Sequence, residues 1–182
     1  MVKKIVNFFL YLLFFMIVLL YFTPKISLYY LAEQKIKPIS GVIISKESLK
    51  DNGFSLEIDN AHISLKGIDS AVIEKINIKI LGFFNTLNIN NITLSSVADS
   101  FIPLHIESIY MHYSLLNPLN IIGKIEGDFG EASVIISLNK DRLQPHLLVT
   151  LTASSKMKKG YRRTLRNFKK NKEGEFIYEK NI

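Results

Sequence analysis

The sequence predicts a mainly β protein with an N-terminal transmembrane helix, a largely antiparallel β-sheet meander and a C-terminal basic amphipathic helix. Three observations predict it: a long apolar run near the start, an alternation of apolar and polar residues through the middle, and a basic segment near the end. The chain has 182 residues, enough for one ordinary domain, and no cysteine, which excludes a disulfide scaffold. Its 48% of hydrophobic and 21% of charged residues exclude a disordered chain.

Residues 5–22 form the apolar run, in which Asn7 is the only polar side chain. Eighteen helical residues, at about 1.5 Å each, cover about 27 Å, close to the hydrocarbon thickness of a bilayer. A cleaved signal peptide is the alternative, but no small residues suited to a signal peptidase follow the run. We therefore expect an uncleaved anchor over residues 1–22, whose membrane-embedded side chains include Ile5, Phe8, Leu12, Phe15, Leu19 and Phe22. Lysines stand on both sides of the run, so charge alone does not fix its orientation.

A short juxtamembrane helix is expected next, over residues 23–38. Thr23 suits the N-cap position and Pro24 the first helical position, and apolar residues then recur at helical spacing until Pro38. Residues 39–182 are expected to form the β-sheet domain, including the basic helix and a last short strand.

The period of the apolar residues changes to two after Val42. We interpret residues 54–59 and 62–66 as paired strands on either side of Asn60. The alternation slips by one residue at Asn90-Asn91, where a bulge or bend would keep the apolar residues before and after it on one face. About eight or nine strands are expected in all. Short turns without helical crossovers join them, which favours an antiparallel sheet.

Each predicted strand has one apolar and one polar side, so the sheet is expected to have a single apolar face that is either covered or holds something. Seven residues are candidates for lining an apolar groove on that face. An ordinary core, capped by the C-terminal helix, is the alternative for the same residues. They are Ile76, Ile78, Ile80, Leu87, Ile89, Val134 and Ile136.

The segment 156–172 has nine basic residues and no acidic one, so the net charge of +7 resides there. A helix over residues 155–171 is predicted, with Ser154 or Ser155 as N-cap and an apolar stripe that contains Met157 and Leu165. Its charges could contact anionic lipid or a partner protein, or face water while the stripe covers the sheet. Nucleic acid is not expected, because no reading motif is present and the chain is tethered to a membrane. The candidate contact residues are Lys158, Lys159, Arg162, Arg163, Arg166, Lys169 and Lys170.

No motif for catalysis, cofactor binding or metal binding is present. The best cluster of metal-ligating residues, His105 and Glu107 with His112 nearby, is interpreted as a solvated strand face. The sequence has no G-x-S-x-G elbow and no glycine-rich phosphate loop. We therefore expect no enzymatic activity, no cofactor, no metal and no small-molecule substrate.

The order of features resembles type II secretion system protein N (GspN) in a short form, within the wider AsmA-like group. The residues that carry the resemblance are Leu28-Tyr29-Tyr30 after the anchor, Gly127-Asp128-Phe129-Gly130, and the ending Leu165-Arg166, Lys169-Lys170, Gly174 and Tyr178-Glu179. The resemblance implies a bacterial inner-membrane anchor with a cytoplasmic N-terminus. It also implies a curved periplasmic sheet whose concave face is apolar. It transfers no functional residue, because the group has no catalytic motif.

Two functions from different classes follow. In the first, the protein is a non-enzymatic accessory component of a secretion or pilus-type envelope assembly, which docks onto partner proteins through sheet edges or the basic helix. In the second, the sheet is a groove that binds or transfers membrane lipid through the seven candidate residues.

Overall fold

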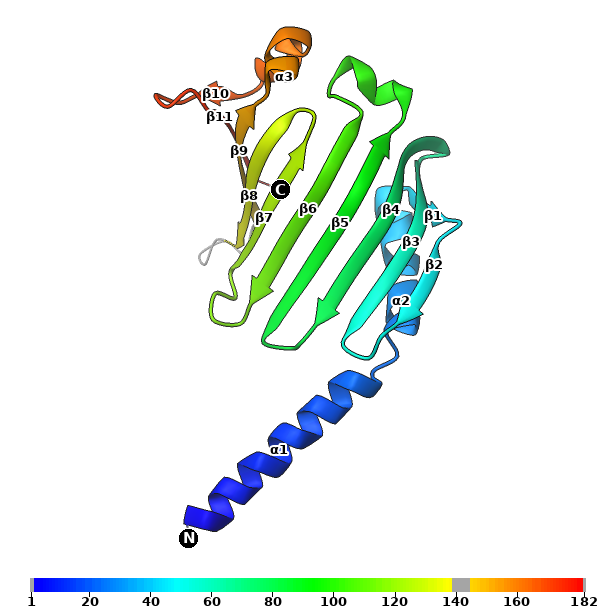
Figure 1. Cartoon of the computed structure of the whole chain (residues 1–182), viewed down its shortest axis with the longest axis vertical. Coiled ribbons are helices and arrows are strands. Elements are labelled where there is room, and N and C mark those ends of the chain that lie inside the picture. The colour runs from blue at the N-terminus through cyan, green and yellow to red at the C-terminus, as the bar shows by residue number, and fades with distance from the viewer. Residues whose placement is uncertain (1, 139–144, 182) are drawn as a thin grey trace.

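The computed structural model describes residues 2–138 and 145–181 and confirms a mainly β protein with an N-terminal apolar helix. Helix α1 comprises Val2–Phe22. Within α1, Lys3–Phe22 is long and apolar enough to cross a membrane, with a mean hydropathy of 2.6, and none of this span is buried inside the protein. Helix α2 comprises Lys25–Ser40 and lies behind the first strands of the sheet in Figure 1.

Eleven strands among the described residues form one antiparallel sheet in the order β1-β3-β4-β5-β6-β7-β8-β9-β11-β10, with β2 also paired to β3. In Figure 1 strands β4 to β6 are seen face-on and β8 and β9 nearly edge-on, so the sheet is curved. The strands are β1 Val42–Ser45, β2 Ser48–Asp51, β3 Ser55–Leu65, β4 Ile68–Ile80, β5 Phe84–Leu94, β6 His105–Ser114, β7 Asn120–Gly127, β8 Gly130–Leu138, β9 Pro145–Ala153, β10 Lys169–Lys170 and β11 Phe176–Asn181.

The predicted number of strands is too low, because β1, β2 and β10 have only four, four and two residues and show almost no alternation. The prediction of two strands on either side of Asn60 is also wrong, since residues 55–65 form the single strand β3. Asn60 does not end the strand; it takes a φ of 57° and the chain continues in the same direction. Asparagine tolerates this left-handed conformation better than other residues with a Cβ.

A bend crosses four neighbouring strands at matched positions. Asn91 has a φ of 54° and faces Glu74, and its side-chain amide donates a hydrogen bond of 2.6 Å to the Glu74 carboxylate. The bend predicted at Asn90-Asn91 is therefore confirmed. At the bend, apolar residues of one face are three positions apart instead of two, in the pairs Ile58 and Ala61, Ile73 and Ile76, Ile89 and Ile92, and Ile106 and Ile109.

Helix α2 begins and ends differently from the prediction. The Thr23 hydroxyl is not its N-cap; it donates a hydrogen bond of 2.6 Å to the Leu19 carbonyl of α1 instead. Pro38 does not end the helix, which continues to Ser40 and stops at Gly41 with a φ of 68°. A proline in the last turn removes one backbone donor only, and Gly41 supplies the left-handed residue that closes a helix.

The single basic helix predicted over residues 155–171 is wrong in its length. The segment forms α3 (Ser155–Gly160) and α4 (Arg162–Leu165), and the chain then enters β10. Ser154 is the N-cap of α3, since its hydroxyl accepts a hydrogen bond of 3.1 Å from the Met157 N–H. The break follows Gly160, where a helix is weakest, and Tyr161 has a non-helical ψ of 40°.

Candidate functional site

The seven predicted groove residues lie on one face of the sheet, which we call the apolar face. Residues that alternate along a strand share a face, and so do directly paired residues of antiparallel neighbours. Ile76, Ile78 and Ile80 alternate along β4, and in β5 Ile89 pairs with Ile76 and Leu87 with Ile78. Direct pairing then continues from Leu87 through Met111 of β6 and Gly123 of β7 to Val134 of β8. Ile136 follows Val134 by alternation along β8.

The apolar face is closed at its two ends and more open between them. Ile76 and Val134 are buried, whereas the other five groove candidates are partly exposed. At the first strands, α2 packs Ile26 and Tyr29 against a buried cluster centred on Ile58. At the last strands, α3 and α4 cover a second cluster that consists of Phe129, Ala132, Leu151, Ala153, Met157 and Leu165. The apolar stripe of the C-terminal segment thus covers part of the sheet.

An apolar cavity of about 200 Å³ lies beneath α3 and α4. The C-terminal segment is also bonded to the 3₁₀ helix η1 (Ser96–Ser100) and the residue after it: the Tyr161 hydroxyl donates to the Asp99 carboxylate at 3.1 Å, and the Thr164 hydroxyl donates to the Phe101 carbonyl at 2.6 Å. The cavity is lined by Ile102, Ile106, Ile109, Ile125, Phe129, Ala132, Val149, Leu151, Met157, Thr164 and Phe168.

A second hollow, of about 250 Å³ and more open than the cavity, lies nearer to the end of the sheet that meets α1. The predicted residues Ile78 and Leu87 line it, together with Met111, Tyr113, Ile121 and the polar Asn85, Thr86 and His112. Met111 of the hollow and Ile109 of the cavity are successive inward residues of β6. The hollow and the cavity are therefore joined by a continuous apolar surface along the middle of the sheet.

The joint between α1 and the sheet is built around one buried lysine. Lys25 is 1% exposed, and its ammonium group donates hydrogen bonds to the carbonyl oxygens of Leu20, Tyr21 and Thr23 at 3.1, 3.4 and 3.0 Å. These carbonyls belong to the end of α1 and the turn after it, where a helix leaves acceptors unsatisfied and attracts cations. The same ammonium group lies 3.7 Å from the Asp51 carboxylate of β2.

Asp51 caps the start of α2 from a distance of 26 residues. Its carboxylate accepts a hydrogen bond of 3.1 Å from the Lys25 N–H and one of 3.0 Å from the Gly53 N–H. Burial alone would raise the pKa of Asp51, but these two hydrogen bonds and the Lys25 charge lower it further than burial raises it, so the pKa lies below its ordinary value. The joint therefore favours the charged carboxylate.

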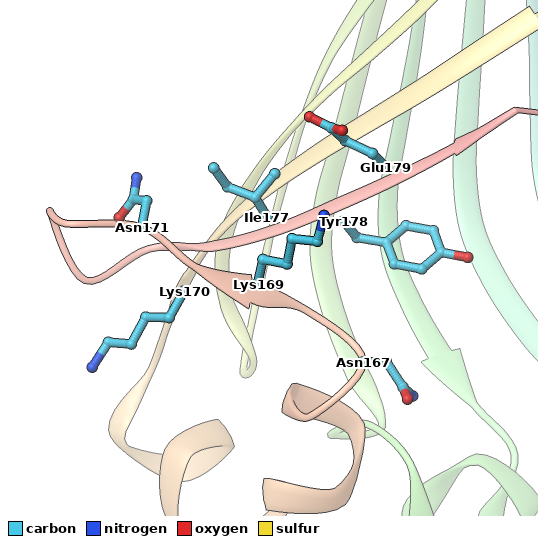
Figure 2. Close-up of a pocket in the computed structure, with 7 residues that line it drawn as sticks. All are labelled: Asn167, Lys169, Lys170, Asn171, Ile177, Tyr178 and Glu179. Carbon is cyan, nitrogen blue, oxygen red and sulfur yellow. The ribbon is translucent and has the colours of Figure 1, made fainter.

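The seven basic candidate residues lie apart from the apolar face. All are exposed, on α3, α4, the turn after α4 and β10, at the end of the molecule far from α1 (Figure 1). Lys169 and Lys170 line a surface depression of about 260 Å³ beside β11, but its side chains do not converge: Figure 2 shows Lys170 and Tyr178 pointing in opposite directions. Asn171 in the same depression accepts hydrogen bonds from the Glu173 and Glu175 N–H groups and has a structural role.

The histidine cluster considered in the sequence does not assemble into a site. His105 and Glu107 are exposed on β6, and His112 stacks on Phe84 with their ring centres 5.7 Å apart. Within residues 2–138 and 145–181, no group of three His, Asp or Glu side chains is arranged to hold a metal ion.

The outer face of the sheet carries ion pairs, together with some apolar residues such as Ile122 and Ile135. Lys75 pairs with Glu57 there, and Lys124 lies 2.5 Å from Glu126 and 3.3 Å from Glu131. The hydrogen bond and charge of Lys75 lower the pKa of Glu57 below its ordinary value. Exposed pairs of this kind add little stability but keep this face solvated.

Sequence reasoning did not include Ile109 and Phe129 among the groove residues, although both line the apolar cavity, whereas Met157 was predicted to lie in a stripe that covers the sheet. The alternation of β6 contains Ile109, so the signal for an inward position was present. The apolar stripe indicates that the C-terminal segment covers the sheet but not which strands it covers, since Met157 and Ile109 are almost fifty residues apart.

No protein-family model matches the chain, and neither a curated protein nor a solved structure matches it.

Proposed function

We propose that this protein is a non-enzymatic, membrane-anchored protein that binds the acyl chains of membrane lipids on the apolar face of its sheet. One observation carries the proposal: the hollow at Ile78 and Leu87 and the cavity at Ile109 and Phe129 form one continuous apolar surface that α2, α3 and α4 cover only at its ends.

The chemistry of this surface suits hydrocarbon rather than a polar ligand. The cavity lining has no charged residue, and its single hydroxyl, that of Thr164, is already bonded to the Phe101 carbonyl. An acyl chain gains about 0.8 kcal/mol for each methylene group that leaves water. Burial of a few methylene groups on the partly exposed middle of the sheet would thus offset the conformational entropy that the acyl chain loses when it becomes ordered.

The resemblance described above supports the cellular placement that we propose. Helix α1 would anchor the chain in a bacterial inner membrane, with the N-terminus in the cytoplasm and the sheet in the periplasm. The length and apolar character of Lys3–Phe22 support the anchor but carry no information on its direction.

Photo-crosslinking in intact cells tests the proposal. A photoreactive residue is placed at Ile78 or Ile136 of the apolar face, and at the adjacent outer-face residues Lys79 or Ser137 as matched controls. We expect lipid adducts in mass spectra from the two apolar-face positions and none from the controls. Equal lipid labelling at all four positions, or labelling by protein alone, contradicts the proposal.

A second candidate function is the accessory role in a secretion or pilus-type assembly, and the free sheet edges favour it. Among the strands of residues 2–138 and 145–181, β2 pairs only with β3 at one edge, and β10 pairs only with β11 at the other. Such edges leave backbone groups free to pair with a strand of another protein. The expected result is an adduct between Lys50 of β2 and one envelope protein, together with loss of export on deletion of the gene. Unchanged export would argue against this role.

A further inference from the structure

We propose that the edge of the sheet nearest to α1 inserts into the surface of the bilayer that α1 spans, with Phe83 and Leu116 as the deepest side chains. This edge, which we call the anchor edge, comprises residues 52–54, 81–83 and 115–117. The inference rests on the proposed function in one respect, namely that α1 is a membrane anchor.

Contacts with α1 fix the depth of the anchor edge. The Cδ1 atom of Leu20 lies 3.4 Å from the position that a Cβ would take on Gly82, and the Tyr21 ring packs on Phe54 with ring centres 5.3 Å apart. Leu20 and Tyr21 belong to the last turn of the apolar span Lys3–Phe22. Two turns of the sheet thus lie at the level of that last turn. Lys25 links the end of α1 to Asp51, whose carboxylate also accepts from the Gly53 N–H of the first of these turns.

Hydrogen bonds between neighbouring turns extend the anchor edge away from α1. The Ile80 N–H donates to the Phe54 carbonyl at 2.8 Å, and the Leu115 N–H donates to the Phe83 carbonyl at 2.9 Å. In Figure 1 these turns form the lower edge of the sheet, beside the upper end of α1. The turn that contains Leu116 is therefore part of the same edge.

The anchor edge has four exposed apolar side chains and no charged one, beside the polar Asn52 and Asn117. Phe83 is 70% exposed and Leu116 98%, with Leu81 at 45% and Leu115 at 48%. No charged residue occurs in 52–54, 81–83 or 115–117. Large apolar side chains that protrude together at the level of a membrane span find an apolar environment in the headgroup and acyl boundary.

The opposite edge of the sheet has a different composition. Its turns carry the charges of Lys66, Asp99 and Asp128. It also exposes two apolar residues, Val97 at 64% and Phe101 at 60%, which flank Asp99 in the sequence. Exposure of apolar side chains is therefore common to both edges, and the absence of charge together with contact to α1 distinguishes the anchor edge.

Insertion would give the apolar face a direct opening to the bilayer. The hollow lined by Ile78, Leu87 and Ile121 lies next to the anchor edge, since Ile80 and Ile121 are close to the turns at 81–83 and 115–117. An acyl chain could then pass from the membrane onto the sheet without entering water.

Depth-dependent fluorescence quenching tests the inference on the full-length protein. The chain has no cysteine, so single substitutions allow one environment-sensitive dye to be attached at a chosen position. The variants are F83C and L116C at the anchor edge, V97C and F101C at the opposite edge, and L12C as a position inside the membrane span. Each is reconstituted in phosphatidylethanolamine and phosphatidylglycerol vesicles, with and without lipids that carry a quencher on the acyl chain.

We expect blue-shifted emission and loss of fluorescence at positions 12, 83 and 116, and neither effect at positions 97 and 101. Quenching at position 12 alone overturns the inference, because the edge then lies in water above a normal anchor. If position 12 is not quenched either, α1 does not span the bilayer, and the inference fails together with the anchor. The photo-crosslinking at Ile78 separates this inference from the proposed function. Quenching at positions 83 and 116 without lipid adducts at Ile78 would support insertion of the edge and contradict the lipid-binding function.

Discussion

The Lys25 ammonium group lies 3.7 Å from the Asp51 carboxylate, and together these two side chains satisfy both helix ends at the joint between α1 and α2. The lysine donates to the Leu20 and Tyr21 carbonyls near the end of α1, and the aspartate accepts from the first N–H of α2. Each helix end would otherwise leave several backbone groups without partners. The direction in which the anchor leaves the sheet is thus held by hydrogen bonds as well as by packing.

Replacement of Asp51 by alanine is expected to lower the free energy of unfolding by about 2 kcal/mol, because a helix cap and the partner of a buried cation are lost together. Asp51→Asn is expected to cost less, since an amide oxygen can still accept the two N–H groups. Chemical unfolding in detergent measures both variants. The exposed Glu107→Ala is the control, and an effect no larger than that of the control would refute the role of the joint.

Stability is expected to fall in acid in a way that depends on Asp51. Its pKa is lowered below the ordinary value of 3.8, so the stabilisation is fully present above about pH 4 and is lost as the pH falls through the lower pKa of the folded protein. The measurement is the slope of unfolding free energy against pH between about 5 and 3, where Asp51→Asn is expected to give a smaller slope than the wild type. Identical slopes would mean that Asp51 titrates normally.

Gly53 and Gly67 provide a matched test of the contact between α1 and the sheet. Both have left-handed backbones, with φ of 79° and 81°, but a Cβ on Gly53 would overlap the Tyr21 ring while a Cβ on Gly67 would meet nothing within 4 Å. Gly67→Ala is expected to cost about 1 kcal/mol for the backbone alone. Gly53→Ala is expected to cost about 1–3 kcal/mol more, because the ring must move. Equal losses in thermal unfolding would show that Tyr21 is not held against Gly53.

Met157 is expected to be the most sensitive position of the C-terminal segment. It is 2% exposed and lines the apolar cavity, so Met157→Ala enlarges an existing void and is expected to cost about 2–5 kcal/mol. The neighbouring Lys158→Ala removes an exposed side chain and is expected to change stability by about 0.5 kcal/mol or less. Denaturant unfolding compares the two. A small effect at Met157 would indicate that α3 is not docked on the sheet.

The sequence was informative where the signal is periodic and local. The alternation of β4 and β5 predicted a shared face for Ile78 and Leu87, and the slip at Asn91 predicted the bend. It was uninformative where contacts join distant segments: nothing near Lys25 indicates that Asp51, rather than Thr23, caps α2. The break after Gly160 was missed because apolar residues at helical spacing continue through it to Leu165 and Phe168, which both pack on the second cluster.

The bend across β3, β4, β5 and β6 requires these four strands to keep matched lengths on both sides of it. At the bend each strand carries two successive residues that do not point to the apolar face, and the paired strands keep the same count. Loss of Asn60 alone would leave β3 one residue shorter than β4 across the bend, so Ala61 could not keep both its place on the apolar face and its pairing with Ile73. We therefore expect single-residue insertions and deletions to be better tolerated in the turns than within the four strands that share the bend.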